Sequence, residues 1–273
     1  MIRYPPPEAG LTARQRRQRI IDQILRNGSV DNDNLVRDFR VSQMTIYRDL
    51  DLLEDLGWLR KVRGGATATP SALFESNVKF RERDNPEAKL AIARHAVEFI
   101  DPGQAIFLDD STTALALASL LPSRGPLTVI TNFLSTINAL SAEASIKIIA
   151  LGGTYYPSYN AFLGLTTSDA SRQYKADAVY LSTSAITDGV CYHQSQEAIM
   201  VKRALMAAAH QKILMVDHSK FHHQALHELA PLSAFDRIIV DSGIDPEQLT
   251  ALREIGVPVD IAPDGPPGQP DPA

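Results

Sequence analysis

Three short polar segments follow apolar runs that are typical of buried β-strands. Residues 109–113, 131–132 and 152–153 form these segments, with the sequences Asp-Asp-Ser-Thr-Thr, Thr-Asn and Gly-Gly. Hydroxyl side chains and free amides at a helix start can bind phosphate, and glycine lets a backbone approach a ligand closely. Each segment alone can be a helix cap or a tight turn. Three together favour a binding site, since ligands of open α/β sheets lie at the carboxyl ends of strands.

A second group of chemically distinctive residues lies in a predicted helix that begins near residue 42. Ile46, Leu50 and Leu53 recur at i, i+4 and i+7, which predicts one buried face. The opposite face and the N-terminal turn carry Ser42, Gln43, Met44, Thr45, Tyr47 and Arg48. Glutamine and arginine pair bidentately with adenine and guanine, and a recognition helix presents its N-terminal residues to the base edges. The segment therefore predicts a helix that reads DNA.

Basic residues continue beyond this helix, on a ribbon that Gly64-Gly65 turns back on itself. Arg60, Lys61 and Arg63 stand where the wing of a winged helix would contact the DNA backbone. The alternative is an interaction domain whose charges are merely solvated. Basic residues on both the ribbon and the helix start favour DNA binding. Residues 1–63 hold 12 Lys+Arg against 9 Asp+Glu, whereas the remaining 210 residues hold 15 against 23, so the two parts are expected to have different partners.

These residues are positioned by two predicted domains. Residues 11–66 carry three helical patterns and the ribbon, with Asn27-Gly28 as a helix stop and Asp31 as a cap. Residues 67–86 are expected to be a linker that contains a short helix, and 262–273 a disordered tail. Residues 87–261 alternate helical patterns with strands expected at 105–108, 127–130, 146–151, 178–181, 213–216, 237–240 and 257–261. This alternation predicts an α/β domain with a mostly parallel sheet covered by helices.

The composition narrows the class of protein. The chain has 273 residues, a net charge of −5 and 44% hydrophobic residues, which is ordinary for a globular protein. A single cysteine, Cys191, excludes a disulfide within the chain. No run approaches the roughly 20 apolar residues of a membrane helix, and the first ten residues lack the apolar run of a signal peptide. We therefore expect a cytoplasmic protein without a membrane partner.

The helical segment resembles the helix-turn-helix of DeoR-type regulators. Residues 41–50, Val-Ser-Gln-Met-Thr-Ile-Tyr-Arg-Asp-Leu, match the family's Val-Ser-x-x-Thr-Ile-Arg-Arg-Asp-Leu. Residues 53–57 and 63–66 follow at the family's spacing, as Leu-Glu-Asp-Leu-Gly and Arg-Gly-Gly-Ala. Tyr47 replaces the first arginine of the usual pair, and Arg63 stands where the family often has histidine. Tyrosine can still donate to a phosphate, so these departures concern the contacts with DNA and not the fold.

The motifs at residues 108–113, 128–132, 151–153, 197–203 and 217–221 resemble the C-terminal sensor of the same family in its order, so the resemblance covers about residues 11 to 261. That sensor is similar in fold to ribose-5-phosphate isomerase and typically binds phosphorylated sugars. The resemblance implies that the effector-binding residues are Asp109, Ser111, Thr112, Thr113, Thr131, Asn132, Gly152, Gly153, Lys202 and Lys220. It also implies a homo-oligomeric repressor of carbohydrate genes, a dimer or tetramer, which binds double-stranded operator DNA, needs no cofactor and is not an enzyme.

Two other interpretations remain open. A sugar-phosphate isomerase with an added DNA-binding head would need a general base, for which Asp188 and Glu197 are the available carboxylates. Four histidines, His218, His222, His223 and His227, include pairs at the i, i+4 spacing of helical zinc ligands. A complete metal site needs three or four converging ligands, and surface histidines around a loop are the favoured interpretation.

Overall fold

The computed structural model describes residues 11–55, 59–67 and 78–265, and the chain divides into two units, Met1–Phe74 and Glu75–Ala273. The predicted linker, 67–86, therefore contributes to both units. Its residues 68–77 lie outside the described residues, and α4 (Val78–Arg81) is the first described helix of the second unit. No described helix has the length and apolar character to span a membrane.

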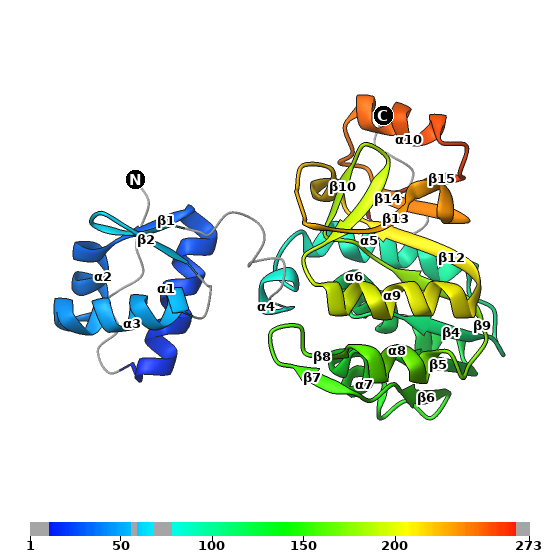
Figure 1. The fold of residues 1–273 in the computed structure, drawn as a ribbon, viewed down its shortest axis with the longest axis horizontal. Helices are drawn as coiled ribbons and strands as arrows, with labels where there is room; N and C mark the ends of the chain where they lie inside the picture. Colours follow the sequence, from blue (N-terminus) through cyan, green and yellow to red (C-terminus); the bar gives the residue numbers. More distant parts are fainter. Residues whose placement is uncertain (1–10, 56–58, 68–77, 266–273) are drawn as a thin grey trace. The chain divides into compact units, whose positions relative to one another are not determined.

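The first unit is a winged helix-turn-helix (Figure 1). Its elements are α1 (Ala13–Asn27), β1 (Ser29–Asp31), α2 (Asn32–Phe39), α3 (Gln43–Asp55), β2 (Arg60–Val62) and β3 (Gly65–Thr67). The predicted stripe Ile46, Leu50 and Leu53 is buried, together with Ile20 and Leu35. The strands form one antiparallel sheet in the order β1-β3-β2. Strand β1 was not predicted, because three residues after a helix stop give no measurable alternation.

Local capping explains where these helices begin and end. The Asp31 carboxylate accepts from the backbone N–H of Asp33 and Asn34, which starts α2, and Ser42 Oγ accepts from Thr45 N at 3.2 Å, which starts α3. Gly28 ends α1 in the left-handed conformation, with φ of 74°. The predicted end of α3 at Gly57 lies outside the described residues.

The second unit contains a parallel sheet of seven strands within its described part (Figure 1). Its strands are β4 (Ala105–Leu108), β5 (Leu127–Thr131), β6 (Ile146–Ala150), β9 (Ala176–Leu181), β12 (Ala209–Val216), β14 (Arg237–Asp241) and β15 (Val259–Ala262). The strand order is β15-β14-β12-β9-β4-β5-β6, and every neighbouring pair is parallel. Each strand overlaps one of the seven predicted ranges, so the predicted fold class is confirmed.

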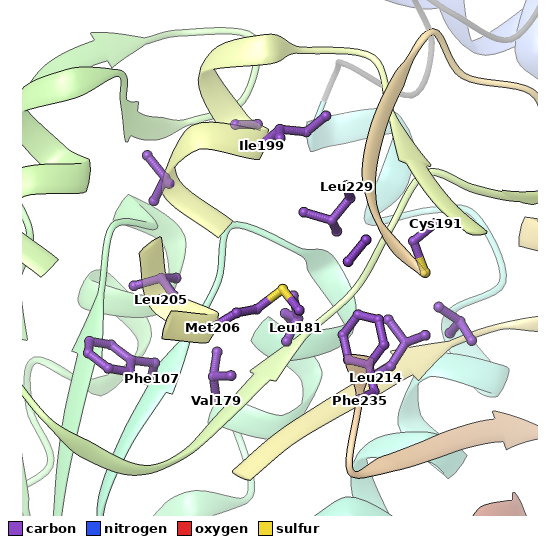
Figure 2. Close-up of a cluster of buried hydrophobic side chains, with 14 of the residues drawn as sticks. Phe107, Val179, Leu181, Cys191, Ile199, Leu205, Met206, Leu214, Leu229 and Phe235 are labelled. Carbon is purple, nitrogen blue, oxygen red and sulfur yellow. The ribbon is translucent and has the colours of Figure 1, made fainter. Parts of the chain in front are cut away.

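Helices cover both faces of this sheet because strand side chains alternate between the faces. Phe107, Val179 and Leu214 point to the face covered by α9 (Gln196–Ala208), and Figure 2 shows them in one cluster with Leu205 and Met206 of that helix. Ile106 and Tyr180 belong to the opposite cluster. The helices that contribute to this second cluster are α5 (Pro86–Ala96), α6 (Thr112–Ala118) and α7 (Leu134–Leu140). Burial of such side chains contributes about 1.5–3 kcal/mol each.

Smaller elements surround the sheet, and the sequence analysis predicted no separate range for them. A hairpin joins β7 (Thr154–Tyr156) to β8 (Ala161–Leu163), and a second antiparallel sheet has the order β10 (Ala185–Thr187), β11 (Val190–His193), β13 (His227–Pro231). The remaining helices are α8 (Leu165–Ser171), α10 (Pro246–Glu254) and the 3₁₀ turns η1 (Val97–Phe99), η2 (Leu121–Arg124), η3 (His218–Phe221) and η4 (Leu232–Ala234).

The chain reverses its direction of travel across the sheet between β4 and β9. It begins at β4, moves outward through β5 and β6, and then returns to β9 on the other side of β4 before reaching β12, β14 and β15. The connections that leave β4 and β9 therefore diverge at the carboxyl ends of these strands. A crevice at such a switch point is where open α/β sheets bind ligands.

Candidate functional site

A polar pocket lies at this switch point. Two hydroxyl-rich turns face each other across it: residues 111–113 after β4 and residues 182–184 after β9. Among the described residues, the lining consists of Arg81, Lys89, Ser111, Thr112, Thr113, Ser182, Thr183, Ser184, His193, Lys202 and Lys220, and the pocket opens to solvent. Four cationic side chains thus meet six hydroxyl groups. Another hollow is lined by α9 residues with Arg172 and includes no residue of the strand ends.

Asp109 fastens the two turns to each other. One carboxylate oxygen accepts from Ser111 N at 3.0 Å, and the other accepts from Ser182 N at 2.9 Å. Lys202 Nζ lies 2.5 Å from the second oxygen. Asp109 is completely buried and is not among the lining residues. Asp109 therefore holds the two turns together from behind the pocket. A direct contact between Asp109 and an effector remains a prediction.

Lys202 keeps its charge although it is buried. Burial disfavours the ammonium ion, but Asp109 and Asp110 outweigh this effect and raise the pKa of Lys202. In the same way, burial opposes the ionisation of Asp110, while Lys202 and then Arg81 and His193 lower its pKa to about 2. Lys202 Nζ lies 3.2 Å from Asp110 Oδ1. Lys202, Asp109 and Asp110 thus form a cluster of fixed charges, in which the ammonium ion lies at the pocket and the two carboxylates lie behind it.

Two further lysines occupy the side of the pocket near α4 and α5. Lys220 Nζ lies 3.7 Å from Asp84 Oδ2 and 3.9 Å from Asp217 Oδ2. Lys89 Nζ donates to the carbonyl oxygens of Arg81 and Asp84. Burial, and then the neighbouring Lys220, lower the pKa of Lys89 to about 8. The charge of Lys89 therefore changes just above neutral pH.

Four of the predicted effector residues lie at or just after the ends of β5 and β6 and do not line the pocket. Thr131 Oγ1 accepts from Phe133 N, and Asn132 Nδ2 donates to Phe162 O of β8. The Gly152 carbonyl accepts from Thr167 Oγ1 at 3.0 Å, and a Cβ on Gly153 would lie 2.1 Å from that same oxygen. Packing of the hairpin and of α8 is therefore enough to explain why these residue types occur here. An effector role for the four residues remains a prediction.

The sequence analysis missed Arg81, Lys89, His193 and residues 182–184. The rule that selected residues 111–113, hydroxyl groups directly after a predicted strand, would also have found 182–184. Arg81 gave no such signal, because it fell within the predicted linker.

The predicted DNA-reading residues form an exposed surface on α3 and the wing. Ser42, Gln43, Met44, Tyr47, Arg48, Arg60, Lys61 and Arg63 are exposed, and Thr45 is half-buried beside Ser42. Lys61 Nζ pairs with the Asp51 carboxylate and lies 3.8 Å from Glu54 Oε2. A phosphate contact by Lys61 would therefore compete with two acidic side chains of the unit itself.

The comparisons with known proteins cover both units. Residues 16–72 match the DeoR-like helix-turn-helix domain, and residues 84–242, more than half of the chain, match the DeoR C terminal sensor domain. The chain belongs to the DeoR family. It is a DNA-binding transcriptional regulator rather than an enzyme.

Named relatives of this DeoR-family chain are repressors and regulators of similar length. The glycerol-3-phosphate regulon repressor of Escherichia coli (strain K12) is 32% identical over 84% of this chain and 90% of its own. The transcriptional regulator IolR of Bacillus subtilis (strain 168) is 28% identical over 90% of this chain and 98% of its own. A solved structure, ribose 5-phosphate isomerase A from Methanocaldococcus jannaschii, has a TM-score of 0.39 and 16% identity over 50% of this chain and 55% of its own. That likeness is too low to carry an argument.

The two carboxylates considered for the isomerase interpretation do not line this DeoR-family pocket. Glu197 accepts from Ser195 Oγ at 2.9 Å, and hydrogen bonds from its own backbone N–H and from Ser195 lower its pKa. Asp188 is exposed in the turn between β10 and β11. Neither residue lines the pocket.

The histidines considered for metal binding have other neighbours. His218 Nδ1 lies 2.7 Å from Asp241 Oδ2, and His222 Nε2 lies 3.2 Å from Asp245 Oδ2. Within the described part of the chain, no three His, Cys, Asp or Glu side chains converge as metal ligands.

Proposed function

We propose that this regulator represses genes of carbohydrate metabolism and releases its operator when a phosphorylated sugar binds in the pocket at the β4–β9 switch point. The observation that carries this proposal is the pocket's lining: four cationic side chains and six hydroxyl groups, with no carboxylate among the described lining residues. Cations and hydroxyls suit a phosphate group, and the hydroxyls and His193 also suit a polyol. The name of the glycerol-3-phosphate regulon repressor supports a regulon of this kind.

The proposed DNA contact uses the exposed side of α3. Gln43 and Arg48 lie near its N-terminal end, with the geometry for adenine and guanine, while residues of the wing approach the flanking phosphates. We propose a dimer or tetramer, because paired recognition helices read the two half-sites of a symmetric operator. Its place of action would be the cytoplasm, where such an operator lies.

The effector would act by favouring an arrangement of the oligomer that no longer matches both half-sites. Coupling between two such sites is typically about 1–3 kcal/mol, which corresponds to roughly 5- to 150-fold in operator affinity. That range is large enough to switch a promoter and small enough to be reversible.

Gel-shift titration tests this function. The full-length protein is titrated onto the DNA upstream of its own gene and of the neighbouring genes. Each titration is repeated with glycerol 3-phosphate, ribose 5-phosphate or glucose 6-phosphate. We expect specific binding that one phosphorylated sugar weakens within that range, and loss of binding in Gln43→Ala/Arg48→Ala. Arg37→Ala, an exposed arginine of α2, is the matched control. Absence of sequence-specific binding at low salt would contradict the repressor, and binding that no phosphorylated compound weakens would contradict the effector class.

A further inference from the structure

A buried arginine that was not among the predicted site residues lines the pocket and has two unpaired donors. Arg81, the last residue of α4, is 8% exposed and lines the pocket. Its Nη1 donates to Asp110 O at 3.1 Å, whereas Nε and Nη2 are enclosed without a hydrogen-bond partner in the described part of the chain. A buried donor left unsatisfied is destabilising, and more so when it is charged. Such donors are therefore matched to an acceptor that a ligand supplies.

The surroundings hold the arginine in place without using these two atoms. The Arg81 carbonyl accepts from Lys89 Nζ and from Thr112 Oγ1, so α5 and the start of α6 both fasten the end of α4. The guanidinium carbon lies 5.8 Å from the centre of the Tyr159 ring, within cation–π range. At its other end, α4 is tied to residue 158 by a hydrogen bond from Val78 N. The side chain is thus fixed before any ligand arrives.

The two unpaired atoms share one edge of the guanidinium group. Nε–H and one Nη2–H point in the same direction, and this fork matches two oxygens of a phosphate or carboxylate. Among the described residues, no carboxylate forms an ion pair with Arg81 within 4.0 Å. The charge of Arg81 therefore remains available to an anion in the pocket.

We propose that Arg81 binds the anionic group of the effector through Nε and Nη2. The proposal rests on the proposed function for the identity of the effector as a phosphorylated sugar, and it adds a residue that neither the sequence nor the family match assigns. Lys89 is a positioning residue, since it holds the Arg81 carbonyl. Because α4 is the first described helix after the division between the units, occupation of Arg81 acts on the part of the sensor that directly follows the DNA-binding unit in the chain.

The test compares Arg81→Gln, Arg81→Lys and Arg83→Gln in the full-length protein. Arg83 is an exposed arginine two residues away and serves as the matched control. Calorimetric titration with inorganic phosphate and with the three sugar phosphates measures affinity, and gel shift measures operator release. We expect Arg81→Gln to weaken anion binding by about 10- to 100-fold, because two charge-assisted hydrogen bonds are lost. Arg81→Lys should recover part of the affinity, and Arg83→Gln should match the wild type.

The outcomes separate this proposal from the proposed function. Arg81→Gln with wild-type affinity for phosphate overturns the assignment, even where its unfolding temperature falls, since that pattern shows a structural role alone. A second outcome is that Arg81→Gln loses phosphate binding while no sugar phosphate makes the wild type release its operator. This outcome upholds the role of Arg81 and contradicts the effector class. A third outcome is that one sugar phosphate binds the wild type and Arg81→Gln equally and makes both release the operator. This outcome upholds the effector class and contradicts the role of Arg81. A wild type that binds no anion overturns both.

Discussion

The ion pair between Arg16 and Asp49 is predicted to determine whether the DNA-binding unit is folded. Arg16 Nε of α1 lies 2.5 Å from Asp49 Oδ2 of α3, and Arg17 Nε lies 3.7 Å from the other oxygen. The side chains of Arg16 and Asp49 are only 9% and 7% exposed. Asp49 follows Arg48 in the motif that reads DNA, but it faces the interior and joins two helices.

Asp49→Ala should destabilise this unit by about 3–5 kcal/mol, because removal of one partner leaves an uncompensated charge in a buried position. Since 1.4 kcal/mol corresponds to tenfold, the ratio of folded to unfolded unit falls by roughly two to four orders of magnitude. Operator binding should be lost although Asp49 contacts no DNA. Asp51→Asn is the control: Asp51 is 52% exposed and pairs with Lys61, which is 37% exposed, so its cost stays below about 1 kcal/mol.

Urea unfolding followed by tryptophan fluorescence measures this difference. The chain has a single tryptophan, Trp58, which falls within the residues of the first unit and is therefore the probe for that unit. We expect a large fall in the fluorescence midpoint for Asp49→Ala and a small one for Asp51→Asn. The double variant Arg16→Met/Asp49→Leu should recover stability, because no charge of this pair is then left buried. Equal midpoints for Asp49→Ala and Asp51→Asn would refute the reasoning.

Three further changes test other parts of the structure. Arg48→Ala should weaken operator binding by about 1–3 kcal/mol in gel-shift titration if it reads a guanine, with the fluorescence midpoint unchanged because Arg48 is exposed; unchanged affinity removes it from the readout. Gly65→Ala should lower the free energy of unfolding by about 1–3 kcal/mol or more and with it that midpoint, since its Cβ would lie 2.0 Å from Val30 O of the paired strand; a wild-type midpoint would show that β1 can move aside. Lys89 is cationic below its pKa of about 8 and neutral above it, so calorimetry should show ribose 5-phosphate binding, dianionic in this range, weakening from pH 7 to pH 9. Lys89→Met should abolish that slope, and a slope retained in Lys89→Met would assign it to another group.

The pattern of apolar residues was sufficient to predict most regular elements. Ile46, Leu50 and Leu53 repeat with the period of a helix, and the seven strand ranges were each recognisable as a short β-rich run between helical patterns. Both signals are local, since they depend on residues less than ten positions apart. Elements of three residues, such as β1, β7 and β10, carry too few positions for a period to appear.

The residues of the candidate site were likewise predictable only where the signal was local in the sequence. The hydroxyl groups of residues 111–113 follow β4 directly and were predicted, but nothing local ranks the exits of β5 and β6 below that of β9. Strand order decides this, since β9 returns beside β4 after the excursion through β5 and β6. Thr131 Oγ1 instead accepts from Phe133 N, and Asn132 donates to Phe162 O of the hairpin, whereas Ser182 is held at the pocket by Asp109.

The sequence by itself determined the family, the two classes of domain and the helix that faces DNA, because motifs and periodicity are written in neighbouring residues. Only the tertiary structure decided which polar groups share a pocket. Arg81, Ser182 and Lys202 are separated by 20 to 121 positions along the chain, and they meet because a parallel sheet brings the carboxyl ends of distant strands, with the helices packed around them, to one edge. Burial then fixes which charges are paired and which remain for a ligand, and it depends on packing that no local pattern encodes.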